Sequence, residues 1–307
     1  MAFLPFLYAL PGAAAEGLIW GLMAIGVYIS YKILDIADLT VDGSICTGGC
    51  VCAVLLGLGV PPWVALLAAL IAGALTGIVT GLLHTSLGIP SILAGILTQL
   101  MLYSVNLLTL SGKSLMSIDP RANKLIVHMS NNSHAVITLV LIVAATIFAL
   151  YKFFYTEVGL TLKSTGDNPH MSRAQGVDVD RNKVIGLAIA NGIVAMAGAL
   201  LAQYKGSANI NDGRGAIVIG LAAIFIGLSV SMKIKPNFVV SLIGVTCGGI
   251  VYYIVYNFVI LMGLKTDYLK MLSAIIVAVF LAVPYLKSKY FTKHKSLHPQ
   301  TGGDRHA

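Results

Sequence analysis

The sequence predicts an all-α polytopic membrane protein with about nine (8–10) transmembrane helices. Three observations support this prediction: 57% of the 307 residues are hydrophobic, only 10% are charged, and the mean hydropathy is +0.88. A soluble domain of this length carries far more charge on its surface. Long apolar stretches recur from one end of the chain to the other, which leaves no room for a separate globular domain.

A helix that crosses a bilayer needs about 20 apolar residues, and several stretches of the chain meet or approach this length. The first stretch lacks a basic start and runs too far for a cleaved signal peptide, so we expect a retained helix. The second and seventh are short and rich in glycine, which favours a broken or only partly spanning helix at one of them. The predicted spans are residues 12–33, 44–60, 62–84, 89–111, 134–154, 184–203, 216–232, 237–262 and 269–286.

The distribution of positive charge predicts the orientation of these spans. Thirteen of the 20 Lys and Arg residues lie on one side if the segment 156–183 and the end of the chain are both cytoplasmic. The positive-inside rule then predicts an external N-terminus and a cytoplasmic C-terminus in the cell (inner) membrane. We therefore attribute the net charge of +8 to contact with the lipid membrane, and expect no nucleic-acid partner. The predicted domains are a membrane domain over residues 1–290 and a basic, disordered tail over residues 291–307.

The third predicted span carries a stripe of small residues on one helix face, at Ala69, Gly73, Gly77 and Gly81. Such a stripe lets another helix approach closely. The partner is either a helix of a second subunit or a helix of the same chain. We favour packing within the chain, because such stripes are common in any dense helix bundle.

Two polar segments, residues 34–44 and 207–215, interrupt the apolar pattern. Each follows a long helix, contains an Asp-Gly pair and opens a short glycine-rich apolar stretch. Under the predicted orientation they lie on opposite sides of the membrane, which is the arrangement expected of an inverted repeat. Their carboxylates at Asp38, Asp42 and Asp212 either bind a solute ammonium group or cap helix ends, and we favour capping.

The predicted spans contain few ionisable residues, and Glu16 is the one acid well inside a span. An ion-driven carrier normally needs a buried charged relay near the middle of the membrane, so we expect the energy for any transport to enter elsewhere. The four cysteines lie in apolar surroundings, and no metal site is expected. Uncharged polar residues either line a pathway for a polar solute or join helix to helix: Thr98, Gln99, Asn106, Asn191, Gln203 and Asn257.

The segment 156–183 contains coherent signals for a short helix. Asn168 suits an N-cap, Pro169 suits the first helical position, and Gly176 suits a left-handed end. These signals predict a helix over residues 169–175. A helix of this length is too short to be stable alone in water, so we expect it to dock on a partner.

The same segment carries a second pattern, Gly159-x-x-Leu162-Lys163-x-x-Gly166-x-Asn168-x-x-x-x-x-Ala174-x-Gly176-Val177. It resembles the coupling loop of ABC importer permeases of the branched-chain amino acid and ribose type. Residues 37–44 and 195–202 are similar to two further stretches of that family. Lys163 stands where the family usually has arginine, which keeps the charge and loses the planar fork. Residues 37–44 look closest to a subgroup of aromatic amino acid or uncharacterised importers.

The resemblance implies a non-catalytic permease subunit that moves a small polar solute such as an amino acid. A separate cytoplasmic ABC ATPase would bind ATP and Mg, since the chain contains no Walker motif. The resemblance also implies an extracytoplasmic solute-binding protein and a permease homodimer. It assigns coupling to the ATPase to Gly159, Leu162, Lys163, Gly166, Asp167, Asn168, Pro169, Arg173, Ala174 and Gly176.

Two other functions compete with this one. An ion-coupled secondary transporter or channel is the alternative among transport proteins, and the shortage of acids inside the spans counts against the carrier. A membrane-embedded enzyme would need clustered His, Asp or Ser residues at the membrane surface. The seven histidines are scattered through loops and the tail, so no catalytic residue is predicted.

Overall fold

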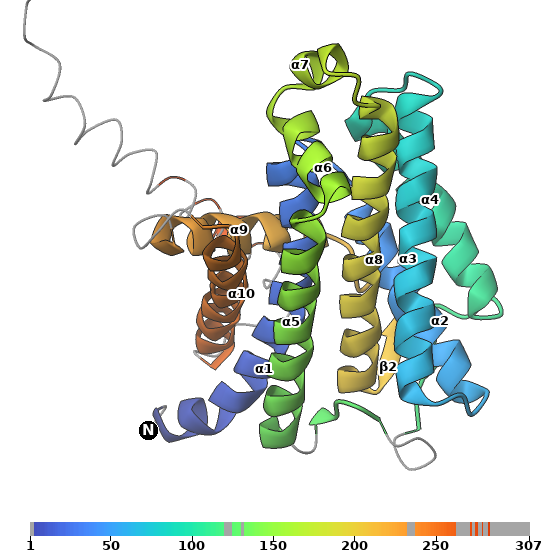
Figure 1. Cartoon of the computed structure of the whole chain (residues 1–307). Helices are drawn as coiled ribbons and strands as arrows, with labels where there is room; N and C mark the ends of the chain where they lie inside the picture. The colour runs from blue at the N-terminus through green and yellow to red at the C-terminus, as the bar shows by residue number, and fades with distance from the viewer. Residues whose placement is uncertain are drawn as a thin grey trace, which may run out of the picture.

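The computed structural model describes residues 3–119, 125–129, 132–231 and 237–261, and the isolated positions 271, 274, 275, 278 and 282. Helices α3 and α8 run side by side, with α5 roughly parallel to them, and α9 lies across their direction (Figure 1). The elements are α1 (Phe3–Tyr28), the π-helical turn η1 (Ile29–Ile33), α2 (Val41–Gly57), α3 (Pro62–Thr85), α4 (Ser91–Thr109), β1 (Leu115–Ser117), α5 (Asn132–Phe154), α6 (Glu157–Asp167), α7 (Pro169–Ala174), α8 (Val179–Lys205), β2 (Ser207–Asn209), α9 (Ala216–Ser231) and α10 (Phe238–Leu261).

The apolar helices follow the predicted spans closely. Six helices in the described part of the chain are long and apolar enough to cross a membrane, and Val41–Gly57 and Ala216–Ser229 are shorter apolar helices. These two are the second and seventh predicted spans, which the sequence already marks as short. An all-α polytopic membrane fold is therefore confirmed. The ninth predicted span, 269–286, and the tail, 291–307, fall almost wholly outside the described residues, so the number nine stays a prediction.

Three elements are absent from the sequence prediction. Helix α6 precedes the predicted short helix, and β1 pairs with β2 as an antiparallel two-stranded sheet in which Met116 is opposite Ala208. Strands of three residues are too short to show an alternating pattern. The sheet joins two loops at the end of the bundle opposite α7, which is called the β end below (Figure 1).

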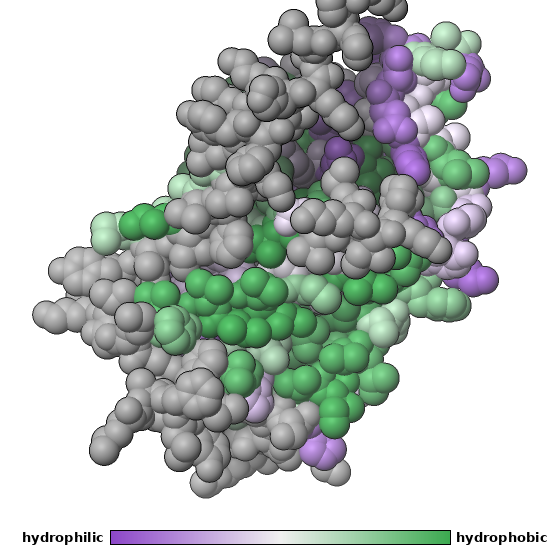
Figure 2. Space-filling view, turned by 90° about the vertical axis from the view of Figure 1, so that its left-hand side faces the viewer, coloured by the Kyte–Doolittle hydropathy of each residue, from purple (hydrophilic) through white to green (hydrophobic). Residues whose placement is uncertain are grey.

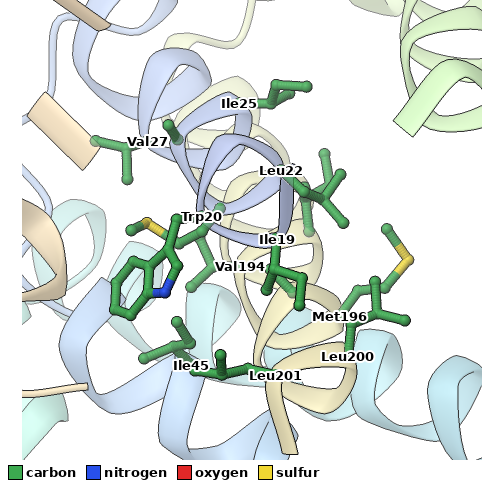
Figure 3. Close-up of a cluster of buried hydrophobic side chains, with 14 of the residues drawn as sticks. Ile19, Trp20, Leu22, Ile25, Val27, Ile45, Val194, Met196, Leu200 and Leu201 are labelled. Carbon is green, nitrogen blue, oxygen red and sulfur yellow. The ribbon is translucent and has the colours of Figure 1, made fainter. Parts of the chain in front are cut away.

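Helix α8 forms the centre of the core. Its residues from Ala190 to Tyr204 are all buried, and α1, α2 and α3 surround it. Figure 3 shows Ile19 and Leu22 of α1 beside Val194 and Met196 of α8, with Ile45 of α2 below them. Unlike a surface helix, α8 is apolar on every face here, and it is covered on every face.

The small-residue stripe of α3 packs against α8 of the same chain. A Cβ atom on Gly73 would overlap the side chain of Ala195 and the backbone of Asn191, and one on Gly77 would overlap the backbone of Leu187. The preferred prediction, packing within the chain, is confirmed. The absence of side chains lets the two backbones approach, and dispersion contacts between them stabilise the pair inside a bilayer.

The outer surface carries the apolar residues expected of a chain in lipid. Large hydrophobic side chains are exposed along α3, α4 and α5, for example Leu67, Leu100 and Leu141. On the face shown in Figure 2, apolar residues form a band across the middle and polar residues gather toward the α7 end. The backbone of these helices is satisfied internally, which the hydrocarbon region requires.

Candidate functional site

The segment 156–183 folds into α6, α7 and the first turn of α8, and of the two short helices only α7 was predicted. The Thr156 side chain accepts a hydrogen bond from Gly159 N at 3.4 Å and caps α6. The Asn168 side chain accepts one from Met171 N at 3.0 Å and caps α7, with Pro169 at its first position. Gly176 has φ +81° just beyond α7. The start of the predicted helix and the left-handed glycine beyond its end are thus confirmed, and its last helical residue is Ala174 rather than Gln175.

Three of the residues assigned to coupling point into the protein. Gly159, Leu162 and Gly166 lie on the inner face of α6, where Leu162 is fully buried. A Cβ atom on Gly166 would overlap the carbonyl oxygen of Ile33 at the end of η1. These residues hold α6 against the bundle.

The remaining coupling residues form an outer surface at the α7 end. The surface also includes Met171, whose exposed fraction is 60%. Arg173 forms an ion pair with Asp180 at 3.1 Å, which ties α7 to the first turn of α8. Apart from the half-buried Pro169, the set is exposed: Lys163, Asp167, Asn168, Arg173, Ala174 and Gly176.

A second group of residues forms a hydrogen-bonded network inside the bundle. Asp38 is 2% exposed, and its carboxylate accepts hydrogen bonds from Thr40 N at 2.9 Å and from Asn191 Nδ2 at 2.7 Å. The Ser44 hydroxyl donates to Oδ1 of the Asn191 side chain at 2.7 Å. Buried polar groups are stable only when they are paired in this way. The buried polar network, as it is called below, consists of Asp38, Thr40, Ser44, Thr76, Thr80, Thr98 and Asn191.

This network fixes the first polar interruption to three helices. The Thr40 and Thr80 hydroxyls lie 2.7 Å apart, and Thr80 donates to Thr98 at 3.0 Å. These two bonds join the start of α2 to α3 and α4, and Asn191 joins it to α8. The sequence singled out Asp38, Asn191 and Thr98 but gave no signal for the other threonines, because Thr is common in membrane helices.

Asp42 joins the two polar interruptions to each other. Its two carboxylate oxygens accept hydrogen bonds from Gly215 N and Ile217 N, each at 2.9 Å. Asp42 therefore caps the start of α9, a helix that is 173 residues further along the chain at Gly215. Cys46 supports the same contact, since its sulfur accepts a hydrogen bond from Gly213 N at 3.1 Å. Asp212 instead forms an ion pair with Lys205 at 3.6 Å.

Replacing Asp42 with alanine is expected to destabilise the protein by about 2 kcal/mol, because two N–H groups at the start of α9 lose their acceptor. The matched Asp212→Ala change removes only a partly exposed ion pair and is expected to alter stability by less than about 1 kcal/mol. Thermal unfolding of the detergent-solubilised chain measures both effects. Equal destabilisation by the two changes would contradict the assigned capping role.

The other two residues assigned to a pathway lie apart from this network. The Asn257 side chain donates a hydrogen bond to the backbone oxygen of Tyr253 at 3.1 Å, and this bond lies within α10. Gln99 is half-buried on α4 and lines a polar pocket. Of the polar residues that the sequence singled out, Asp42 and Asn106 share that pocket with Gln99.

This polar pocket has a volume of about 350 Å³ and lies where α2, α4 and the loop before α9 meet. A larger hollow of about 570 Å³ between α3, α5 and α8 has an almost wholly apolar lining, which gives a polar solute no partner. Arg214 and Tyr103, which the sequence did not single out, both reach the polar pocket. We call it the central pocket; it is lined by Asp42, Gly43, Cys46, Gln99, Leu100, Tyr103, Asn106, Ile210 and Arg214.

Comparisons with known proteins agree with this architecture. The family model described as "Branched-chain amino acid transport system / permease component" matches residues 11–283. The chain is similar to the "Tyrosine transport system permease protein" of Clostridioides difficile (strain R20291), with 36% identity over 93% of this chain and 94% of that protein. It is also similar to the "Uncharacterized protein RP368" of Rickettsia prowazekii (strain Madrid E), with 30% identity over 88% of this chain and 95% of that protein. No solved structure matches the chain significantly.

The family match extends over nearly all of the apolar helices, the segment 156–183 and both polar interruptions. It agrees with the resemblance drawn from the pattern between Gly159 and Val177. The chain therefore belongs to the family of permease components of branched-chain amino acid transport systems.

Proposed function

We propose that this chain is the membrane subunit of an ABC importer that moves an amino acid, and that α7 transmits the motion of the ATPase. The observation that carries the proposal is the short, capped and exposed helix α7 at one end of a permease of this family. The 36% identical relative is named as a tyrosine transport permease, which supports an aromatic amino acid as the substrate.

The contacts of α6 and α7 support a role in coupling. The Ser172 hydroxyl lies 3.3 Å from that of Ser164 on α6, and Asn182 of α8 donates to Thr165 on α6 at 3.1 Å. α6 in turn packs against η1 through Gly166. A displacement of α7 would therefore reach both η1, which leads into the buried polar network, and α8, which carries Asn191 of that network.

The proposed assembly contains two copies of this permease, two ATPases that bind ATP and Mg, and an extracytoplasmic binding protein. The α7 end would face the cytoplasm, with the C-terminus on the same side, and the β end would face the binding protein. ATP-driven closure of the ATPases would then switch the pathway between outside and inside.

One observation favours the alternative, an ion-coupled carrier. Asp38 is a buried carboxylate inside the bundle, and such a group often carries a proton or binds a cation in carriers. Here the two carboxylate oxygens of Asp38 accept hydrogen bonds from the backbone N–H of Thr40 and from the side chain of Asn191. The bond from Asn191 attaches Asp38 to α8. This arrangement is better suited to holding helices together than to exchanging an ion.

Replacing Met171 with aspartate is expected to reduce the amount of ATPase that co-purifies with the permease by about tenfold or more, because it places a charge in a desolvated contact. Met129 is the matched control. Both methionines are 60% exposed, and Met129 lies at the β end, where Ile126 N bonds to Gln203. Met129→Asp is expected to leave ATPase binding unchanged.

The measurement is purification of the full chain co-expressed with its genomic ATPase and binding protein, followed by amino acid uptake in proteoliposomes. Uptake that needs ATP and the ATPase supports the proposal. Uptake by the chain alone, driven by an ion gradient, would overturn it in favour of the carrier. Equal loss of ATPase with both methionine variants would overturn the assignment of α7 as the docking helix.

A further inference from the structure

The central pocket lies at the point where both polar interruptions meet. Asp42 and Cys46 of α2 contact the loop of residues 210–215 and the start of α9, and α4 closes the other side of the pocket. Its volume of about 350 Å³ is within the range of small-molecule sites. Its wall combines polar side chains with the apolar Leu100 and the aromatic ring of Tyr103.

Asn106 provides a second, independent sign of a ligand. The residue is only 2% exposed, it lines the central pocket, and its side-chain oxygen has no hydrogen-bond partner among the described residues. A buried carbonyl oxygen without a partner is destabilising. A donor brought in by a ligand would remove this penalty.

Arg214 supplies the opposite chemistry in the same pocket. Its guanidinium forms no ion pair with any residue that the structure describes, so its donors remain available. Guanidinium groups bind carboxylates through parallel hydrogen bonds. Asp42 adds a negative charge to the pocket, although both of its oxygens already accept backbone hydrogen bonds.

We propose that the central pocket binds the zwitterionic head of the transported amino acid, with Asn106 accepting from its ammonium group and Arg214 pairing with its carboxylate. Asp42 stabilises the ammonium group electrostatically, and Leu100 contacts the side chain of the substrate. This inference rests on the proposed function, because it names the substrate contacts of the same permease.

The pocket is tested by thiol labelling of the purified permease–ATPase complex without its binding protein. Tyr103 is 44% exposed and serves as the probe position. A Tyr103→Cys, Cys247→Ser chain is labelled with a charged maleimide. The three other cysteines are buried, and because Cys46 also lines the pocket, the Cys247→Ser chain gives the background labelling. We expect millimolar L-tyrosine or L-leucine to slow labelling by about tenfold, and analogues without the amino or the carboxylate group to slow it far less.

Substitutions at Asn106 and Arg214 test the proposed contacts with the ammonium and carboxylate groups of the substrate. Asn106→Leu and Arg214→Gln are each expected to abolish the protection, whereas Arg214→Lys keeps the charge and retains part of it. Lys113→Gln is the control, because Lys113 is an exposed cation that does not line the pocket. Unchanged protection in Asn106→Leu and Arg214→Gln, or no protection in the parent chain, would overturn the inference.

The outcomes separate this inference from the proposed function. ATP-dependent uptake of an amino acid with no protection of the central pocket would leave the importer intact and overturn the substrate site. Protection without ATP-dependent uptake would overturn the importer and leave the site as an amino acid site of another kind.

Discussion

Replacing Gly48 with alanine is expected to destabilise the protein by about 3 kcal/mol, the upper end of the cost of overpacking a tight core. Gly48 lies where α2 crosses α8, and a Cβ atom there would overlap the backbone of Ala195. The same crossing brings Gly198 of α8 against the backbone of Ile45 of α2. Because backbone atoms cannot rotate away as a side chain can, the two helices would have to separate.

The neighbouring Gly49 is the matched control for this change. Its nearest neighbour, the Gly198 carbonyl oxygen, would be 3.4 Å from an added Cβ, which is an ordinary contact. Gly49→Ala is therefore expected to be neutral or to stabilise the helix by up to about 1 kcal/mol, as alanine does in a helix interior. Thermal unfolding in detergent measures both variants. Equal behaviour of the two would show that α2 and α8 do not cross this closely.

Replacing Asn191 with leucine is expected to destabilise the protein by about 3 kcal/mol or more, because it leaves a buried carboxylate without its main partner. Asn191 is fully buried, donates to Asp38 at 2.7 Å and accepts from Ser44 at 2.7 Å. Leucine has a similar size but has neither the amide donor nor the amide acceptor of asparagine. The first polar interruption would lose its attachment to α8, so we also expect reduced transport.

Asn257→Leu is the matched control for this second change, since Asn257 is half-buried and bonds only within α10. Its effect is expected to stay below about 1 kcal/mol. A double-mutant cycle with Asp38→Ala tests the pairing directly, and the two changes together should cost at least about 1 kcal/mol less than their sum. Additive effects of the two changes would contradict a stabilising hydrogen bond between Asp38 and Asn191.

Much of the helical architecture could be predicted from the sequence. The stretches 62–84 and 134–154 became α3 and α5 with ends that differ by two residues or fewer, because apolar length in a membrane leaves no alternative to a helix. α8 begins at Val179, five residues before the predicted span, because the Asp178 side chain caps it through Arg181 N at 3.0 Å. A polar first turn cannot be recognised by hydropathy.

The candidate site was only partly predictable, because the sequence gives the positions of its residues but not the helix face on which each residue lies. Gly159 and Gly166 belong to the pattern that identified the family, and in the structure Gly159 packs against α5 and Gly166 against η1. The pattern gives their spacing but not which helix face the neighbours cover, since α6 itself was not foreseen. Likewise Asp42 was correctly associated with capping, but the helix that it caps begins far away in the chain.

The sequence by itself therefore determined the membrane fold, the short capped helix α7 and the family, because each of these depends on local composition, local capping or a local pattern. Only the tertiary structure decided which polar residues meet. Asp38 with Asn191, Asp42 with α9, and Asn106 with Arg214 are each brought together by helices that are distant in the chain. The close approach of α2, α3 and α8 across glycine backbones makes these meetings possible, and no single segment contains that information.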